Sequence, residues 1–312
     1  MTSQTDTSSP ALSEVIAQGL QSSPKELPAR VLYDEVGSRL FEQITRLPEY
    51  YPTEAERALL AECADDIWQV THARTLVEFG AGIQDKTRLL IDAGRRYGSL
   101  QHFQPIDISS QVLLEAANSL DESHHGLTVE PVVGDFMADI QLPDSPQPRL
   151  TCFLGGTIGN LVPNERVDFL QKVARMTGSG GFVLVGTDLV KPLDRIVDAY
   201  NDASGVTAAF LLNVVNVMNA ECGLQLNESD FDYVPLWDAH ESRMDLRLRS
   251  RNQQTFNVDG HRVHLAEGEE IRIEVSTKFT LDQVHEEFSS AGLEVQEQFR
   301  NDDFGLTLAR CS

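Results

Sequence analysis

Basic residues are scarce in this chain of 312 residues, in which 25 Lys and Arg accompany 48 Asp and Glu and leave a formal net charge of −23. A polyanion of that size is repelled by nucleic-acid phosphates and by anionic lipids, so neither is expected as a partner. Cysteine is also rare, and Cys63, Cys152, Cys222 and Cys311 form no C-x-x-C pair. Their spacing excludes a zinc ribbon and a disulfide scaffold and favours a reducing compartment.

Long apolar runs and metal-binding histidine motifs are missing as well. No stretch of about 18 consecutive apolar residues occurs, so no membrane span is expected. The eight histidines form no H-E-x-x-H motif, and we expect no metal site. Residues 1–10 are rich in Ser and Thr and lack the basic and apolar regions of a signal peptide, which predicts a disordered tail on a cytoplasmic protein.

Short apolar runs alternate with amphipathic stretches between Arg74 and Leu189. The runs predict strands at 75–79, 102–106, 128–133, 150–154 and 182–186, and helical periodicity lies between them at 86–97, 110–120 and 164–176. This alternation is typical of an α/β fold, in which helices cover both faces of a mostly parallel sheet. Ligand-binding loops are expected at the carboxyl ends of those strands.

The flanking segments follow a different pattern. Residues 33–51 are expected to be irregular, and a helix is expected to begin at Thr53, with Glu56 reaching back to complete a capping box. Two helices at 194–201 and 206–219 precede a β-rich section at 243–279, whose clearest hairpin turn is Asp259-Gly260. Strands at 293–299 and 304–309 then provide an antiparallel finish to the sheet. The first domain is therefore predicted to be interrupted by an insertion.

The loop after the first strand is the most informative short motif, and it contains Glu78, Gly80 and Gly82 in the pattern E-x-G-x-G. A dinucleotide site needs a third glycine and a phosphate loop needs a glycine before its lysine, but Asp85 stands at that position in both alignments. A carboxylate there repels phosphate, which weakens both interpretations. The pattern instead resembles the first motif of class I S-adenosylmethionine-dependent methyltransferases, whose ligand is a cationic nucleoside without a pyrophosphate.

Two further strand ends carry residues that suit such a nucleoside. Asp107 follows the second run and is placed to accept hydrogen bonds from both ribose hydroxyls. Asp135 and Phe136 follow the third run, where a carboxylate can bind the exocyclic amine of adenine and a ring can pack on the base. S-adenosyl-L-methionine is therefore the expected cofactor.

Longer strings extend the resemblance from about Leu27 to Leu308. They are YDEVGSRLF at 33–41, ITRLPEYYPT at 44–53, GGTIGN at 155–160, GTDLVK at 186–191 and EVSTKF at 274–279. On these strings the chain resembles the histidine Nα-methyltransferase family of the ergothioneine pathway. The resemblance implies a class I methyltransferase (Rossmann-like) α/β core, with a mostly parallel sheet and an antiparallel final strand, plus an inserted α+β substrate-binding domain. The core is expected at 55–190 with 280–312, and the substrate-binding domain at 11–54 with 191–279.

The resemblance also implies roles for individual residues. The implied cofactor site comprises Glu78, Gly80, Gly82, Lys86, Asp107, Asp135 and Phe136. Asn160 and Tyr200 are expected to hold the substrate α-carboxylate, with Tyr33 and the backbone around Gly155 near the reacting amine. The implied side-chain pocket comprises Tyr50, Met244, Glu274 and Ser276, where Tyr50 is chosen over its neighbour Tyr51.

Strict alternation in residues 269–276 predicts that Glu274 and Ser276 share one face of a strand, opposite Ile271, Ile273 and Val275. Such a polar face is usually solvated, but the family resemblance makes it a candidate pocket wall. A carboxylate beside a hydroxyl suits an imidazole, which carries an N–H on one or both nitrogens, and suits an indole poorly. Glu274 therefore favours histidine over tryptophan.

The expected activity is Nα-methylation of free L-histidine, with three successive transfers that give the trimethylated betaine hercynine. Tyr33 is expected to orient the amine and to accept or relay its proton without acting as a strong base. Two alternatives stay open. One is a related methyltransferase that acts on another free amino acid, such as tryptophan, or stops before the third methyl; the other is a non-catalytic S-adenosylmethionine-binding protein. We expect a monomer with a small-molecule substrate and with neither nucleic acid nor membrane as a partner.

Overall fold

The computed structural model describes residues 11–80, 85–108, 110, 113, 120, 124–135, 137–138 and 140–312. The chain forms two compact units: unit 1 comprises Met1–Tyr51 and Pro192–Thr277, and unit 2 comprises Pro52–Lys191 and Lys278–Ser312. Each unit has a hydrophobic core of its own. The predicted tail at 1–10 and most of the predicted helix at 110–120 lie outside the described residues.

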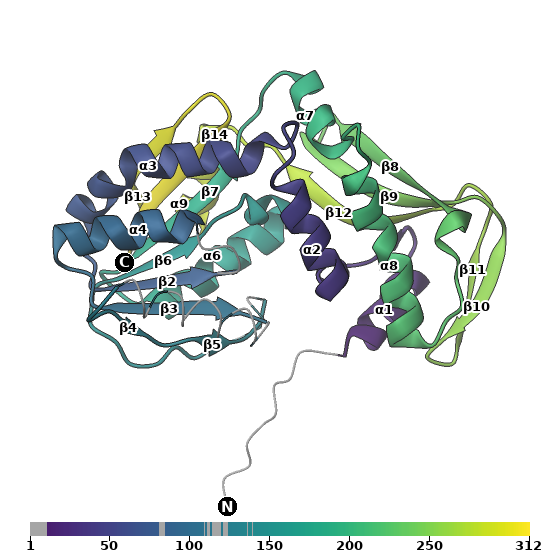
Figure 1. Ribbon diagram of the computed structural model, residues 1–312, viewed down its shortest axis with the longest axis horizontal. Helices are drawn as coiled ribbons and strands as arrows, with labels where there is room; N and C mark the ends of the chain where they lie inside the picture. The colour runs from purple at the N-terminus through teal and green to yellow at the C-terminus, as the bar shows by residue number, and fades with distance from the viewer. Residues whose placement is uncertain are drawn as a thin grey trace, which may run out of the picture. The chain divides into compact units, whose positions relative to one another are not determined.

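Unit 2 is built on a sheet in the strand order β13-β14-β7-β6-β2-β3-β4, with β5 also paired to β3 (Figure 1). The strands are β2 (Thr75–Phe79), β3 (His102–Asp107), β4 (Thr128–Val129), β5 (Val132–Val133), β6 (Arg149–Phe153), β7 (Phe182–Asp188), β13 (Leu293–Arg300) and β14 (Phe304–Cys311). Strands β2 to β7 pair in parallel, whereas β14 runs antiparallel to β7 and β13. The predicted mostly parallel sheet with an antiparallel final strand is confirmed.

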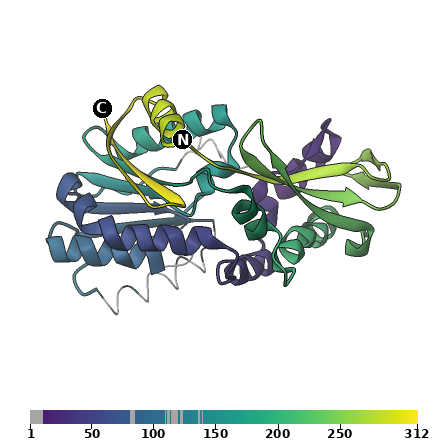
Figure 2. The same ribbon diagram turned by 90° about the horizontal axis from the view of Figure 1, so that it is seen from above.

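Helices cover both faces of this sheet, so unit 2 has three layers (Figure 2). On one face lie α3 (Tyr51–Thr71) and α4 (Asp85–Tyr97), and on the other α6 (Pro163–Thr177) and α9 (Leu281–Ser290). Strand β2 is buried at all five positions, as expected for a parallel strand covered on both sides. A short 3-10 helix, η2 (Thr157–Asn160), follows β6.

Unit 1 is built on a four-stranded sheet in the order β1-β12-β9-β8 and a separate hairpin, β10-β11. The strands are β1 (Lys25–Glu26), β8 (Phe231–Asp238), β9 (Arg243–Ser250), β10 (Gln254–Val258), β11 (His261–Leu265) and β12 (Glu270–Thr277). The helices are α1 (Leu12–Gln21), η1 (Ala29–Leu32), α2 (Glu35–Ile44), α7 (Leu193–Tyr200), α8 (Val206–Cys222) and η3 (Glu228–Asp230). The predicted turn at Asp259-Gly260 is confirmed, because Val258 pairs with His261. Strand β8 lies outside the β-rich section that the sequence predicts.

The segment 33–51 is not irregular as predicted, because it contains α2. Asp34 begins this helix: its Oδ1 accepts hydrogen bonds of 2.7 Å from the Gly37 amide and of 2.7 Å from the side chain of Asn213. Position 37 must be glycine in this geometry, since a Cβ there would lie 1.7 Å from the Leu32 carbonyl oxygen. The string at 33–41 therefore builds a tight junction between η1 and α2, and Tyr33 lies inside that junction.

Candidate functional site

The carboxyl ends of the parallel strands of unit 2 meet at one edge of the sheet. Phe79 at the end of β2 pairs with Ile106 on β3 and with Phe153 on β6. Asp107 ends β3 and pairs with Val133 on β5. The residues that follow these strand ends are therefore brought to the same edge, and they are the predicted site residues Gly80, Asp107, Asp135, Gly155 and Asn160.

Gly80 and the two aspartates at this edge lie in turns that follow the strands. Gly80 has φ +68, and among the described residues other than its chain neighbours no heavy atom lies within 4 Å of the position that a Cβ would take. The Asp107 carbonyl accepts a 2.9 Å hydrogen bond from Gly134, and Asp135 Oδ1 accepts one of 2.8 Å from the Met137 amide. Gly82 and Phe136 lie outside the described residues.

Glu56 is predicted from the sequence to complete a capping box at Thr53, and this prediction is wrong because α3 already begins at Tyr51. Its fully buried carboxylate instead accepts a hydrogen bond from the Gly155 amide, 2.9 Å from both oxygens, and forms an ion pair with Lys86. Gly186 leaves the necessary room, since a Cβ there would lie 2.0 Å from Glu56 Oε1. One carboxylate thus joins two predicted site residues, and the sequence pattern alone assigns it a different role.

Glu78 is buried in β2, where its carboxylate accepts a 2.5 Å hydrogen bond from the Thr87 hydroxyl on α4. Burial raises the pKa of Glu78 to about 7, although the hydrogen bond from Thr87 and the charge of Lys86 act in the opposite direction. Burial, with the nearby charge of Glu78, also raises the pKa of the Cys152 thiol on the adjacent strand β6. Glu78 therefore ties the end of the strand to the first turns of α4.

An aromatic cluster occupies part of the core of unit 1. The Tyr33 ring centroid lies 5.7 Å from that of Phe41 and 5.7 Å from that of Phe210, in edge-on geometry. Tyr50 lies edge-on to Tyr200 at 6.4 Å. Its neighbour in the sequence, Tyr51, has the guanidinium of Arg195 at 5.1 Å from its ring centroid.

The tyrosines of this cluster also have polar partners. The hydroxyls of Tyr200 and Ser276 are 2.7 Å apart, and the Tyr233 hydroxyl donates a 2.7 Å hydrogen bond to the Tyr200 carbonyl. Burial, and next the charge of Glu274, raise the pKa values of Tyr33 and Tyr233 well above the ordinary tyrosine range. Glu274 is therefore close enough to act on both hydroxyls, and Tyr33 is a neutral phenol at neutral pH.

A β-bulge in β12 decides which way Glu274 and Ser276 point. The pairing register with β9 shifts between Arg272 and Glu274, which makes Ile273 an extra residue. Before the shift Ile271 pairs with Leu248; after it Glu274 pairs with Leu246, and Ser276 with Met244. These three β9 residues alternate along one face and are buried in the core of unit 1.

Cross-strand partners lie on the same face of a sheet, so Glu274 and Ser276 face the core of unit 1 together with Ile271. The prediction that Glu274 and Ser276 share a face is confirmed. The prediction that this face is opposite Ile271 is wrong, because the inserted residue shifts the alternation by one. Ser276 is consequently buried and Glu274 is half-buried, so this polar pair does not form a fully solvated face.

The predicted site residues thus form two groups, one in each unit. Unit 1 contains Tyr33, Tyr50, Tyr200, Met244, Glu274 and Ser276, and unit 2 contains Glu78, Gly80, Lys86, Asp107, Asp135, Gly155 and Asn160. In the described part of the chain, no group of three or more His, Cys, Asp or Glu side chains could hold a metal ion. No helix among the described residues is long and apolar enough to cross a membrane.

Residues 12–311 match the family described as histidine-specific, SAM-dependent methyltransferase. The chain is 41% identical over 308 residues to the histidine N-alpha-methyltransferase of Mycolicibacterium smegmatis, covering 97% of this chain and 96% of the relative. It is 30% identical over 242 residues to ergothioneine biosynthesis protein 1 of Schizosaccharomyces pombe, covering 74% of this chain and 31% of the relative. A crystal structure of a putative methyltransferase from Thermobifida fusca aligns with a TM-score of 0.48 at 11% identity, covering 94% and 97% of the two chains.

Proposed function

The chain belongs to the histidine-specific, S-adenosylmethionine-dependent methyltransferases, and from that membership we propose that it methylates the α-amine of free L-histidine. One structural observation carries the choice of amino acid: a bulge turns Glu274 and Ser276 toward the interior of unit 1, beside an aromatic cluster. A half-buried carboxylate next to a buried hydroxyl suits the N–H groups of an imidazole. An indole has a single N–H and otherwise needs apolar walls, so this arrangement favours histidine over tryptophan.

The cofactor of the family, S-adenosylmethionine, supplies a methyl group as an electrophilic carbon on a sulfonium. The strand-end edge of unit 2 fits such a nucleoside. Asp107 and Asp135 offer carboxylates for ribose hydroxyls and for an exocyclic amine, and Ile108, Val133 and Met137 are exposed apolar side chains close to them in sequence. The charge of Lys86 is matched by Glu56. We assign Gly80, Lys86, Asp107 and Asp135 to the cofactor, with Glu78 holding α4 in place; Gly82 and Phe136 are assigned by resemblance alone.

Histidine would be held at both of its ends. We assign Glu274 and Ser276 to the imidazole, with Met244 and Tyr50 packed around the ring. Asn160 and Tyr200 would donate hydrogen bonds to the α-carboxylate, because a neutral amide and a phenol bind a carboxylate without placing another cation near a sulfonium. The Gly155 backbone and Tyr33 are assigned to the amine.

The amine must lose its proton before each transfer, because only the lone pair of the nitrogen can form the new N–C bond while the S–C electron pair returns to sulfur. Burial keeps Tyr33 neutral, since it raises the pKa of its hydroxyl. A neutral phenol oxygen can accept a hydrogen bond from the amine and pass the proton onward, but it is not a strong base. Three such cycles would give the trimethylated betaine.

The test is turnover with an unbiased mixture of amino acids. Purified protein, S-adenosylmethionine and the twenty amino acids are incubated together, and the products are analysed by mass spectrometry. We expect histidine alone to gain mass, by three methyl groups. Binding of S-adenosylmethionine with no methylated amino acid would instead identify a non-catalytic binding protein, and methylation of another amino acid would reject histidine as the substrate.

A further inference from the structure

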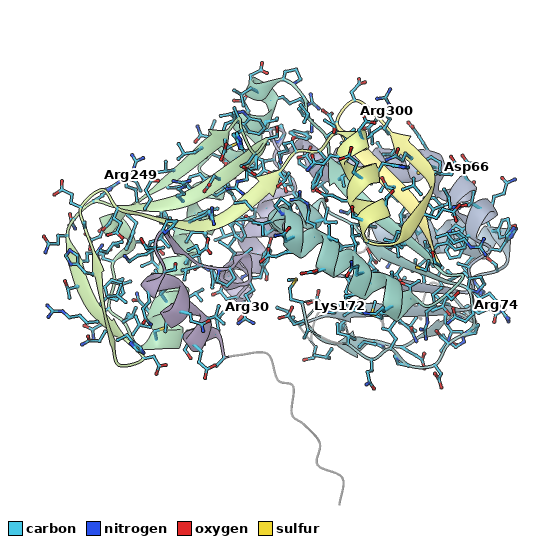
Figure 3. All side chains as sticks on the ribbon, turned by 180° about the vertical axis from the view of Figure 1, so that it is seen from behind. Arg30, Asp66, Arg74, Lys172, Arg249 and Arg300 are labelled. Carbon is cyan, nitrogen blue, oxygen red and sulfur yellow. The ribbon has the colours of Figure 1, made fainter. Side chains whose placement is uncertain are left out.

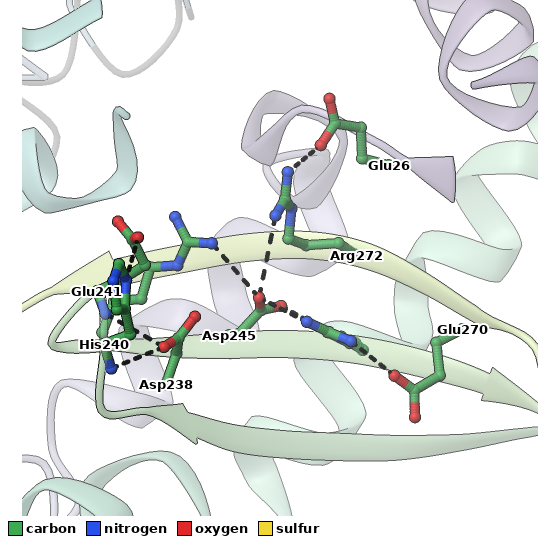
Figure 4. A network of polar contacts seen from close by, with 9 residues as sticks. Glu26, Asp238, His240, Glu241, Asp245, Glu270 and Arg272 are labelled. Atoms are coloured by element: carbon green, nitrogen blue, oxygen red, sulfur yellow. Dashed lines mark hydrogen bonds and ion pairs between the residues drawn. The ribbon is translucent and has the colours of Figure 1, made fainter. Parts of the chain in front are cut away.

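The face of β9 and β12 that points away from the core of unit 1 carries a buried carboxylate surrounded by arginines (Figure 4). Asp245 is only 1% exposed. Arg247 donates to both of its oxygens, at 2.7 and 2.8 Å, and the guanidinium groups of Arg243 and Arg272 lie 3.9 and 4.0 Å from Oδ2. The hydrogen bonds with Asp245 raise the pKa of Arg247, which therefore stays charged beside this carboxylate.

This network spans the bulge. Arg272, the last β12 residue before the register shift, pairs with Arg247 on β9. Val275, which lies after the shift, pairs with Asp245. Asp245 therefore interacts with residues on both sides of the extra residue Ile273. A bulge leaves its extra residue without a partner in the ladder, so side-chain contacts across it help to fix the register.

Arg272 has a second carboxylate partner, and it comes from another strand. Its guanidinium forms an ion pair with Glu26 on β1, while its carbonyl accepts a 2.8 Å hydrogen bond from the Leu27 amide. Strand β1 leads through η1 directly to Tyr33. Arg272, on the strand that carries Glu274 and Ser276, is thus bonded to the segment that leads to Tyr33.

We propose that Arg272 is a positioning residue for amino-acid recognition: by linking Asp245 to Glu26 across the bulge, it keeps Glu274 and Ser276 turned toward the core of unit 1. The inference rests on the proposed function, because it assigns those two side chains to the imidazole. Slippage by one residue would turn both side chains to the opposite face of the sheet. Arg272 itself lies on the opposite face and acts only through its neighbours.

The experiment compares Arg272→Gln with Arg249→Gln. Arg249 is a matched control because it also projects from the outer face, where Figure 3 shows it, and ion-pairs with Glu270, away from the bulge. We expect the KM for histidine to rise about tenfold in Arg272→Gln, with kcat and the KM for S-adenosylmethionine within about twofold of the unmodified protein. Arg249→Gln should leave all three parameters within about twofold.

Three outcomes are separable. If the unmodified protein does not methylate histidine, the proposed function fails and the role of Arg272 in recognition fails with it. If it does, and Arg272→Gln has the histidine KM of Arg249→Gln, the proposed function stands and the positioning role is wrong. If Arg272→Gln does not fold, Arg272→Lys is tested instead. Lysine cannot bind two carboxylates in the planar geometry of arginine, so a histidine KM raised about threefold or more supports the positioning role. An unchanged histidine KM in Arg272→Lys rejects it.

Discussion

At the scale of single residues, three glutamates show how burial and partners set the properties of a carboxylate. Glu56 is fully buried but is matched by Lys86 and a backbone amide. Glu78 is buried beside a hydroxyl, and its pKa rises to about 7. Glu274 faces an interior that is rich in tyrosine and raises the pKa of Tyr33. The same residue type thus serves as a counter-ion, as a titrating group and as a proposed ligand for substrate.

Replacing Glu274 with Gln should weaken histidine binding. The change removes a charge-assisted hydrogen bond to the imidazole while preserving side-chain volume, so the binding free energy should fall by about 1.5–3 kcal/mol. Isothermal titration with histidine measures it, and Glu267→Gln, at an exposed turn of unit 1, serves as the control. Unchanged histidine affinity in Glu274→Gln would remove Glu274 from the imidazole site.

Replacing Glu56 with Gln should destabilise the fold and weaken cofactor binding together. The variant leaves the Lys86 ammonium, only 17% exposed, without its carboxylate, and breaking a buried ion pair costs about 3–5 kcal/mol. Urea unfolding and titration with S-adenosylhomocysteine measure the two effects. Glu165→Gln, which alters an exposed carboxylate at the start of α6, should change neither the stability nor the cofactor affinity. If both variants have similar stability and similar cofactor affinity, the proposed role of Glu56 is wrong.

Glu78 should make stability depend on pH in a direction opposite to that of most carboxylates. Its pKa is about 7 in the folded protein and ordinarily 4.5, so the folded state holds this proton more tightly than the unfolded state. The resulting stabilisation is complete below pH 4.5 and is lost as the pH rises through 7. Glu78→Gln should remove this loss of stability. The loss is worth about 3 kcal/mol, because each unit of pKa shift corresponds to about 1.36 kcal/mol. Urea unfolding of the unmodified protein and of Glu78→Gln at pH 5 and pH 8 measures the effect. If the two proteins differ in their free energy of unfolding by the same amount at both pH values, the prediction is wrong.

At the scale of elements, local pattern and tertiary contact contribute differently. Thr280 is the N-cap of α9, accepting a hydrogen bond from the Gln283 amide at 3.2 Å. Thr53 has the same sequence signature but lies inside α3, because the helix begins at Tyr51 and Glu56 is drawn into the core of unit 2. Strict alternation likewise fails in β12, where one extra residue reverses the faces. In both failures a buried ionic contact accompanies the departure from the local pattern.

The η1–α2 junction offers a test at this scale, through Gly37→Ala. The added Cβ would lie 1.7 Å from a backbone oxygen, so the junction must open, and the cost should be about 1–3 kcal/mol. Since Tyr33 lies in the junction, kcat for histidine methylation should fall as well. Ser38→Ala, at the next and exposed position, should leave stability and kcat nearly unchanged. A stable Gly37→Ala with full activity would show that the junction does not position Tyr33.

At the scale of the whole molecule, the chain passes between its two units three times, after Tyr51, after Lys191 and after Thr277. Lys191 and Lys278 flank the last two crossings within unit 2, and both ammonium groups bind Asp188, the latter at 2.9 Å. Lys191 also donates a 2.8 Å hydrogen bond to the Asp303 carbonyl. Unit 2 therefore anchors the last two crossings to a single buried carboxylate at the end of β7.

Asp188→Asn should accordingly destabilise unit 2 more than an ordinary surface change does. Two buried ammonium groups would lose their shared carboxylate, and the cost should be about 3–5 kcal/mol. Calorimetric unfolding measures it, and Asp194→Asn in the first turn of α7 is the control, since Asp194 is exposed. Equal unfolding temperatures for the two variants would show that the lysines are held by other contacts.

The sequence by itself determined the α/β class, the parallel strands and their antiparallel finish, because hydrophobic periodicity and turn chemistry are local properties of the chain. It also determined the family, since strings such as GGTIGN and EVSTKF are long enough to be specific. Only the tertiary structure decided that Glu274 and Ser276 face inward and that Glu56 pairs with Lys86. Both depend on contacts between segments far apart in the chain, and a shift of one residue or a distant ion pair leaves no trace in local periodicity.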